Sequence, residues 1–296
     1  MPVTLIGVLG LGLAVGQLAK WRPRVGYLSA AGLLLVSVAG AWQNDGYVSQ
    51  LRLASRGRET IETFKQVGEF RSEGPTVLAA TWGLDYFALA YGVLVNKEIP
   101  NVAIVDQTAP YDQLLAAGDR VYVLPRFFYL YDLKFWDQKL GRVHLTSAAP
   151  GLVQVSNTAA ATPSDVPPGS PTLIGDSLSL LGQRVTFDSA ANTVQVTLYW
   201  QAAAPPSQDY SVFVHLSHHP AITTGDDILA QSDSAAPVYG FYPTTRWSAG
   251  EIVREDYTVP LPDERRPILL RVGLYTRTAD GGFNNLGEAN FPITIQ

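Results

Sequence analysis

Two apolar runs, Val3–Ala19 and Val25–Trp42, open the chain on either side of the basic segment Lys20–Arg24. Each run is near the lower limit of the roughly 17–25 residues that a helix needs to cross a bilayer. Because the connection between them is basic, the positive-inside rule places it in the cytoplasm and residues 43–296 outside the cell. The pattern therefore predicts a transmembrane helical hairpin over residues 1–42, with the lipid bilayer as a partner and the cell membrane as the location.

The same segment also fits a secretory signal peptide. In this interpretation Lys20–Arg24 is the basic region, Val25–Val38 is the apolar region and Ala39–Ala41 is a small-residue cleavage site, but Val3–Ala19 then has no role. The hairpin interpretation places Met1 outside the cell, which leads us to expect further helices upstream. Both interpretations export the bulk of the chain.

Residues 43–155 alternate between helical and strand patterns. An amphipathic helical pattern at Leu51–Phe70 is followed by short apolar runs with helical segments between them. Such runs, apolar on both faces and joined by helices, are typical of a covered parallel sheet, so we predict a small exocytoplasmic α/β domain. The expected strands are Thr76–Thr81, Asn101–Val105, Arg120–Leu124 and Arg142–Thr146, and the expected helices are Leu84–Leu94, Tyr111–Ala117 and Tyr129–Leu140.

Residues 156–171, SNTAAATPSDVPPGSP, lose all apolar periodicity and predict a semi-extended linker. Residues 172–296 then alternate apolar and polar side chains in strand period, with turns between the runs, which predicts an antiparallel β-sandwich of about seven strands. Its clearest expected strands are Val194–Gln201, Tyr210–Ser217, Asp227–Ser232, Ile252–Val259, Ile268–Tyr275 and Phe291–Ile295. The predicted fold is thus multi-domain: a transmembrane hairpin, an α/β domain with a parallel sheet, and a C-terminal antiparallel β-sandwich.

Composition narrows the possible partners. All 26 acidic residues follow Trp42, so the region beyond it is acidic and offers no basic surface for nucleic acid, which we exclude as a partner. The chain has no cysteine, which excludes disulfides, thiolate metal sites and a cysteine nucleophile.

A first candidate site lies at the carboxyl ends of the predicted parallel strands, where α/β sheets usually bind ligands. Trp82, Asp85, Asp106 and Arg126 follow these strands and offer stacking and charged groups suited to a sugar or a phosphate. A structural role explains the two acids equally well. Asp85 can cap the helix that follows it, and Asp106 can begin an Asx turn before Pro110.

A second candidate site is the aromatic loop from Val238 to Trp247 of the sandwich. Its Tyr239, Tyr242, Arg246 and Trp247 form one possible sugar-binding platform, because planar rings pack against the apolar faces of sugars. The alternative is that the rings close the open end of the sandwich and that Arg246 stacks or pairs locally.

The histidines and the acidic pairs do not make a convincing metal site. His215, His218 and His219 precede Pro220, which predicts a turn, and Asp226, Asp227 and Asp233 lack the dense oxygen pattern of a calcium loop. No nucleophile elbow is present. We predict no metal, no cofactor and no catalytic residue.

The chain resembles the C-terminal region of bacterial polytopic membrane glycosyltransferases, which are similar to dolichyl-phosphate-mannose protein mannosyltransferases and have a GT-C fold. The segments that carry the resemblance are Val196–Ala202, Tyr210–Leu216, Tyr242–Glu251 and Leu270–Tyr275, and Trp42–Val155 looks like the α/β region after the last helix of such enzymes. The resemblance implies transfer from a lipid-linked sugar donor. It also implies an acidic general base in the first exocytoplasmic loop, and no residue of this chain matches that motif.

Two hypotheses follow, and whether the chain belongs to an enzyme stays open between them. In the first, the chain is the exocytoplasmic terminal part of a membrane glycosyltransferase, partnered by upstream helices, and supports the enzyme or recognises its acceptor. In the second, it is an independent membrane-anchored module that binds a glycan or a protein.

Overall fold

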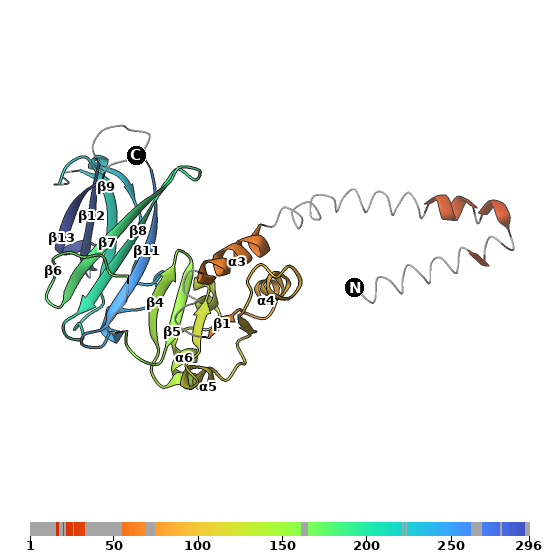
Figure 1. Ribbon diagram of the computed structural model, residues 1–296. Helices are drawn as coiled ribbons and strands as arrows, with labels where there is room; N and C mark the ends of the chain where they lie inside the picture. The colour runs from red at the N-terminus through yellow and green to blue at the C-terminus, as the bar shows by residue number, and fades with distance from the viewer. Residues whose placement is uncertain are drawn as a thin grey trace. The chain divides into compact units, whose positions relative to one another are not determined.

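The computed structural model of the protein divides into two compact units, residues 1–56 and 57–296. Figure 1 shows the sheets and helices of the second unit. The residues that the structure describes are 16, 17, 20, 22–25, 27–32, 55–68, 75–160, 165–220, 222, 224–261, 268–278 and 280–293.

The predicted transmembrane hairpin is not supported. No helix among the described residues is long and apolar enough to cross a membrane. The longest helix with fully described bounds, α3 (Arg56–Lys65), has 10 residues, about half of the roughly 20 that a bilayer requires. This finding contradicts the hairpin over residues 1–42 and the cell-membrane location with residues 43–296 exocytoplasmic. Most of the two apolar runs themselves lie outside the described residues.

The first half of the second unit is built on a five-stranded sheet with the order β2-β1-β3-β5-β4. The three strands β2, β1 and β3 are parallel to one another, whereas β5 pairs with both β3 and β4 in the antiparallel sense. The sheet is therefore mixed, which corrects the predicted parallel sheet. Its strands are β1 (Thr76–Ala79), β2 (Ala103–Val105), β3 (Arg120–Val123), β4 (His144–Ala149) and β5 (Leu152–Ser156).

The antiparallel part of this sheet arises from a hairpin that the sequence pattern did not reveal. Pro150 and Gly151 form the turn between β4 and β5, and Gly151 has a φ of 75°, a conformation that glycine adopts without strain. The turn reverses the chain, so β5 returns and inserts between β4 and β3.

Short helices accompany the sheet. The region predicted as one helix over Leu84–Leu94 is an α-helix that continues as a π-helix. The helix predicted from Tyr129 begins only at Leu133, where the Asp132 side chain accepts a hydrogen bond from the Phe135 backbone N at 3.1 Å and caps the first turn. The helices are α4 (Leu84–Ala90), η2 (Tyr91–Val95), α5 (Tyr111–Ala116), η3 (Pro125–Tyr129) and α6 (Leu133–Leu140).

Two antiparallel four-stranded sheets form the second half, with the orders β10-β9-β12-β13 and β11-β8-β7-β6. Their inner faces meet in a core that includes the buried side chains of Trp200, Val214 and Val272. The strands are β6 (Thr172–Ile174), β7 (Leu178–Asp188), β8 (Thr193–Ala202), β9 (Ser211–Ser217), β10 (Ile228–Gln231), β11 (Ile252–Pro260), β12 (Ile268–Arg277) and β13 (Phe283–Ile293), and short 3₁₀ turns lie at η4 (Gly225–Asp227) and η5 (Thr244–Arg246).

Strands β4 and β11 bring the two halves together, as Figure 1 shows. The Arg254 backbone N donates to Thr146 Oγ1 at 2.9 Å, and the Arg254 guanidinium donates to the Ala148 carbonyl at 2.8 Å. Asp165, in the segment predicted as a linker, accepts a hydrogen bond from the Tyr199 hydroxyl at 2.6 Å. One hydrophobic core cluster contains residues of both halves, so the two halves pack as a single unit.

Candidate functional site

A pocket of about 470 Å³ lies on the outer face of the β10-β9-β12-β13 sheet. In β9, Val212 and Val214 belong to the core, and the alternation of a strand turns Phe213 and His215 to the opposite face. Ligand sites commonly have volumes of about 300–1,000 Å³. We call this site the outer-face pocket. It is lined by Phe213, His215, Ile222, Ile228, Gln231, Asp233, Arg271, Tyr275, Phe283, Asn285 and Glu288.

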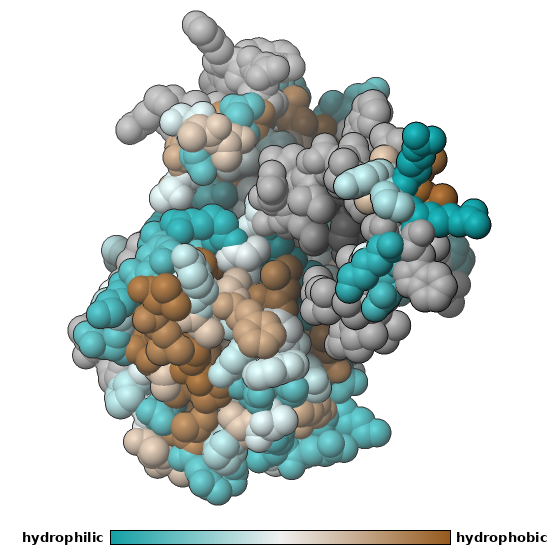
Figure 2. Space-filling model, turned by 90° about the vertical axis from the view of Figure 1, so that its right-hand side faces the viewer, coloured by the Kyte–Doolittle hydropathy of each residue, from teal (hydrophilic) through white to brown (hydrophobic). Residues whose placement is uncertain are grey.

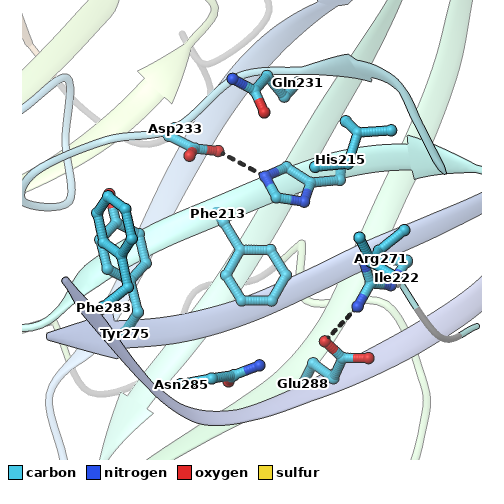
Figure 3. Close-up of a pocket in the computed structure, with 11 residues that line it drawn as sticks. Phe213, His215, Ile222, Gln231, Asp233, Arg271, Tyr275, Phe283, Asn285 and Glu288 are labelled. Atoms are coloured by element: carbon cyan, nitrogen blue, oxygen red, sulfur yellow. Dashed lines mark hydrogen bonds and ion pairs between the residues drawn. The ribbon is translucent and has the colours of Figure 1, made fainter. Parts of the chain in front are cut away.

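Strand register brings these residues together. In the pairing of β9 with β12, Phe213 lies opposite Gly273 and His215 lies opposite Arg271. In the pairing of β12 with β13, Gly273 lies opposite Glu288. Side chains that face each other across strands are close neighbours, so residues distant in sequence form one surface. Figure 3 shows this surface with its side chains.

Phe213 forms the floor of the pocket because its neighbour Gly273 has no side chain. A Cβ atom at Gly273 would lie 2.3 Å from Phe213 Cζ and 2.5 Å from the Gly287 carbonyl oxygen, so no other residue fits without displacing the ring. The His215 ring lies 4.8 Å from the Phe213 ring, centroid to centroid, and the Arg271 guanidinium lies 6.0 Å from it.

Two charge-bearing pairs flank the floor. His215 Nε2 lies 3.1 Å from Asp233 Oδ1, and Arg271 Nη2 donates to Glu288 Oε2 at 2.6 Å. Figure 3 shows these pairs on either side of Phe213. Each of these four side chains therefore already has a partner, which leaves the described lining of the pocket without an unmatched positive charge for an anion.

Aromatic rings form one wall of the pocket. Tyr275 and Phe283 pack edge to face with ring centroids 5.3 Å apart, and Tyr275 lies 6.5 Å from Phe213. Phe283 is 66% exposed, so its ring is available to a ligand. The amide side chains of Gln231 and Asn285 lie at the edge of the same pocket. Flat apolar surface and polar groups thus lie side by side.

The four residues of the first predicted site do not form one cluster in the structure. Asp85 is 3% exposed and forms an ion pair with Arg126, whose Nε and Nη2 donate to its two carboxylate oxygens at 2.9 and 3.0 Å. Arg126 Nη2 also donates to Thr60 Oγ1 at 2.6 Å. This network ties η3 to α3 and α4, and Asp85 and Arg126 are the two predicted residues of this site that meet directly.

Asp106 and Trp82 do not take part in that ion pair. Asp106 Oδ1 accepts hydrogen bonds from the Thr108 backbone N at 2.8 Å and from Thr108 Oγ1 at 2.6 Å, which is the expected Asx turn. Trp82 is exposed and packs against Tyr86 and Phe87, with ring centroids 5.0 Å away in both contacts.

The exposed rings of Trp82 and Phe87 continue into an apolar surface on α4 and η2. Figure 2 looks onto this side of the molecule and shows apolar side chains gathered there. The exposed apolar residues of this surface are Trp82, Leu84, Phe87, Tyr91, Leu94 and Val95.

The aromatic loop of the sandwich faces the α/β half. The Tyr242 hydroxyl donates to Glu251 Oε1 at 2.8 Å and lies 3.1 Å from His144 Nδ1, and burial, with the Glu251 charge beside it, raises the pKa of Tyr242. Trp247 is fully buried and stacks on Tyr242 with ring centroids 6.1 Å apart. These two rings therefore pack inside the fold.

The other two predicted loop residues also contact the α/β half. Arg246 Nη2 donates to both carboxylate oxygens of Asp137, at 2.7 and 2.9 Å. The Tyr239 hydroxyl accepts a hydrogen bond from the Gly151 backbone N at 2.7 Å, and burial raises the pKa of Tyr239. The loop thus connects the sandwich to α6 and to the β4–β5 turn.

None of the eight residues predicted from the sequence lines the outer-face pocket. The sequence of β9 held one indication of this pocket. On the strand face that points away from the core, Phe213 is a large ring and His215 is a titratable group. Arg271 and Gly273 give the same signal in β12. Their meeting depends on register between strands, which the sequence pattern does not show.

Within the described part of the chain, no group of three or more His, Cys, Asp or Glu side chains is arranged to hold a metal ion. The rings of His218 and His219 lie 6.5 Å apart, centroid to centroid.

Comparisons with known proteins assign no family. No family model matches the chain, and no curated protein matches it. A solved structure with some likeness is a C2 domain of RIM from Drosophila, which is 14% identical over 40% of this chain and 86% of that chain, with a TM-score of 0.24. At that TM-score the likeness carries no argument about fold or function.

Proposed function

We propose that this chain is a noncatalytic binding protein that holds a neutral glycan in the outer-face pocket. The observation that carries the proposal is an aromatic floor and wall, Phe213, Tyr275 and Phe283, beside two pairs of polar side chains that already contact each other. No residue is assigned a catalytic role.

The apolar part of the pocket suits the carbon-bound face of a sugar ring. Aromatic side chains combine a large apolar area with a defined plane, and they are favoured where one side of a ligand is apolar and the other is wet. Phe283 offers such a plane at the rim, and Tyr275 supports it from behind in an edge-to-face contact. A sugar that stacks on Phe283 directs its hydroxyl groups toward the polar side chains of the pocket.

The polar part of the pocket suits a ligand without charge. Asn285 and Gln231 carry amides that donate and accept, and the Asp233 and Glu288 carboxylates accept. Because Arg271 is bound to Glu288 and His215 lies beside Asp233, a phosphate or sulfate would meet two carboxylates that repel it, although Arg271 Nε and His215 Nδ1 have no hydrogen-bond partner among the described residues. A hydroxyl group can add a hydrogen bond to either pair without breaking it.

The resemblance to the C-terminal region of bacterial glycosyltransferases is compatible with a glycan ligand. It implies that such a site would recognise the acceptor of a sugar transfer. That role stays a prediction and rests on the strand segments named above.

A glycan array tests the proposal with the full chain. We expect retention of neutral oligosaccharides in preference to sulfated or sialylated ones. Phe283→Ala and Asn285→Ala should each weaken retention about tenfold or more, because Phe283 supplies the exposed stacking plane and Asn285 supplies an amide for the sugar hydroxyl groups. The matched control is Tyr129→Ala, which removes an exposed ring from the α/β half and should bind as the unaltered chain does. Binding that all three variants retain would contradict the proposal.

A further inference from the structure

A second cavity, of about 360 Å³, lies between the edge strands of the two sandwich sheets and is also lined by Pro150 and Gly151 of the β4–β5 turn. On one side it follows the consecutive residues Glu255 to Thr258 of β11, and on the other it follows Ser232 to Ser234, just after β10. Both strands are the outermost members of their sheets. We call this cavity the edge groove. It shares Asp233 with the outer-face pocket but does not depend on the function proposed for that pocket.

Glu255 is the unusual member of the edge groove. Along β11 the side chains of Val253 and Tyr257 belong to the core, so Glu255, which lies between them in the alternation, also faces the sandwich interior. It is 1% exposed, and neither of its carboxylate oxygens has a hydrogen-bond partner within the described part of the chain. A buried acceptor in this state costs roughly 1–3 kcal/mol, and more when it is charged.

The neighbouring acids of the groove differ from Glu255 because they are already satisfied. Asp256 accepts a hydrogen bond from Thr197 Oγ1 at 2.6 Å and pairs with the Arg254 guanidinium at 3.1 Å. Asp233 is paired with His215. The groove therefore holds three carboxylates, and the one that lies deepest is the one without a donor.

The nearest polar neighbours do not supply the missing donor. Tyr257 Oη and Trp200 Nε1 are buried and also without a hydrogen-bond partner in the described residues. These two side chains and the Val238 backbone N–H lie close enough to lower the pKa of Glu255 in part, but burial is the largest effect and, with the Asp256 charge beside it, raises the pKa of Glu255 to about 8. Without a ligand, the carboxyl group of Glu255 is therefore mostly protonated at neutral pH. The proton removes the charge that a bound cation would otherwise match.

We propose that the edge groove binds a primary ammonium group, which donates hydrogen bonds to Glu255 and matches its charge. An ammonium group has three donors and a compact charge, whereas a hydroxyl group or a water molecule satisfies an oxygen atom but leaves the charge unmatched. Asp233 and Asp256 also line the groove, but each is already paired with a basic side chain, so Glu255 is the acid left to match the charge of the ligand. The ammonium group can belong to an amino sugar or to a simple alkyl amine, and both share this chemistry.

Calorimetry with the full chain tests the proposal. The probes are n-butylammonium chloride and n-butanol, which differ in the ammonium group, at pH 7 in two buffers with different ionisation enthalpies. We expect saturable binding of n-butylammonium, little binding of n-butanol, and release of close to one proton per bound amine, because the ammonium charge drives Glu255 to ionise. Equal binding of both probes, or amine binding without proton release, would overturn the proposal.

Variants assign the effect to Glu255. Glu255→Gln should weaken amine binding by at least about tenfold, since it removes a charge-assisted acceptor. Glu62→Gln is the matched control, because the Glu62 side chain is 48% exposed on α3 and does not line the edge groove, and it should bind as the unaltered chain does. An amine affinity that Glu255→Gln leaves unchanged would overturn the proposal. If that variant fails to fold, the proton count on the unaltered chain decides the question.

Two sugars distinguish the source of the ammonium group. Glucosamine carries a free amine, and N-acetylglucosamine carries the same amine capped. Tighter binding of glucosamine than of n-butylammonium supports an amino sugar as the ligand, and equal binding supports recognition of the amine alone. In the Phe283→Ala chain, whose outer-face pocket is weakened, N-acetylglucosamine that binds as tightly as glucosamine would overturn the role of the ammonium group.

Discussion

Phe213 and Gly273 face each other across β9 and β12, and the ring of Phe213 occupies the space that a side chain at position 273 would fill. This contact sets the floor of the outer-face pocket. Because Arg271, two residues before Gly273, is also close to the ring, the floor and one charge pair are fixed by the same strand register.

Gly273→Ala tests this contact. The new Cβ would lie 2.3 Å from Phe213 Cζ and 2.5 Å from the Gly287 carbonyl, so both the ring and the backbone of β13 must shift. We expect a loss of about 1–3 kcal/mol in the free energy of unfolding, measured by urea denaturation, together with weaker glycan binding. Gly225→Ala, where no atom lies within 4 Å of the added Cβ, should change the stability little. Equal stabilities of the two variants would contradict the packing described here.

The Asp85–Arg126 pair should stabilise the α/β half. Arg126→Met removes the two hydrogen bonds to Asp85 and the bond to Thr60, and the loss should be about 3 kcal/mol because Asp85 is buried. Combining it with Asp85→Asn should recover part of that loss, since the amide carries no charge. Denaturation of the single and double variants measures this. A double variant that loses the sum of the two single effects would show that the residues are not coupled.

Tyr242 should join the two halves through its hydroxyl. Tyr242→Phe keeps the ring but removes the hydrogen bonds with Glu251 and His144, and we expect a loss of about 1–2 kcal/mol in thermal or urea unfolding. Tyr129→Phe, at an exposed ring, serves as the control and should be neutral. A neutral Tyr242→Phe would mean that the hydroxyl network does not hold the interface.

The raised pKa of Glu255 predicts how the free energy of unfolding depends on pH. Its pKa in the folded chain, about 8, lies above its ordinary value of 4.5, so the folded state binds the proton more tightly than the unfolded state. The stabilisation is complete below pH 4.5 and decreases as the pH rises toward 8, by an amount on the order of several kcal/mol. Comparing Glu255→Gln with the unaltered chain by denaturation between pH 5 and pH 8 measures this contribution. Identical pH profiles would refute it, and Glu62→Gln should keep the profile of the unaltered chain.

The alternation of apolar and polar residues predicted the position of many strands, because burial of one strand face produces this alternation within each strand. The runs at Val194–Gln201 and Tyr210–Ser217 lie within β8 and close to β9, and the Asx turn at Asp106 forms where the sequence indicated it. The predicted parallel sheet was wrong because β5, which follows the Pro150–Gly151 turn, inserts between strands that are distant in sequence. Local patterns do not specify such pairing.

The candidate site could not be predicted for a related reason. We predicted a sugar-binding platform in the aromatic loop because the loop is rich in aromatic residues. The rings of Tyr242 and Trp247 are instead buried in the fold, where their large apolar area stabilises packing. The outer-face pocket uses residues from four strands, and only their register places His215 beside Arg271. The apolar runs of residues 1–42 predicted a spanning hairpin from hydropathy and length alone, and no helix among the described residues supports it.

The most direct test of the proposed function is the affinity of the neutral oligosaccharide that the array retains best, measured by calorimetry for the full chain, for Phe283→Ala and for Tyr129→Ala. We predict that Phe283→Ala weakens binding about tenfold or more while Tyr129→Ala binds as the unaltered chain does. Equal affinities of all three proteins would contradict a glycan site on the outer face of the β10-β9-β12-β13 sheet.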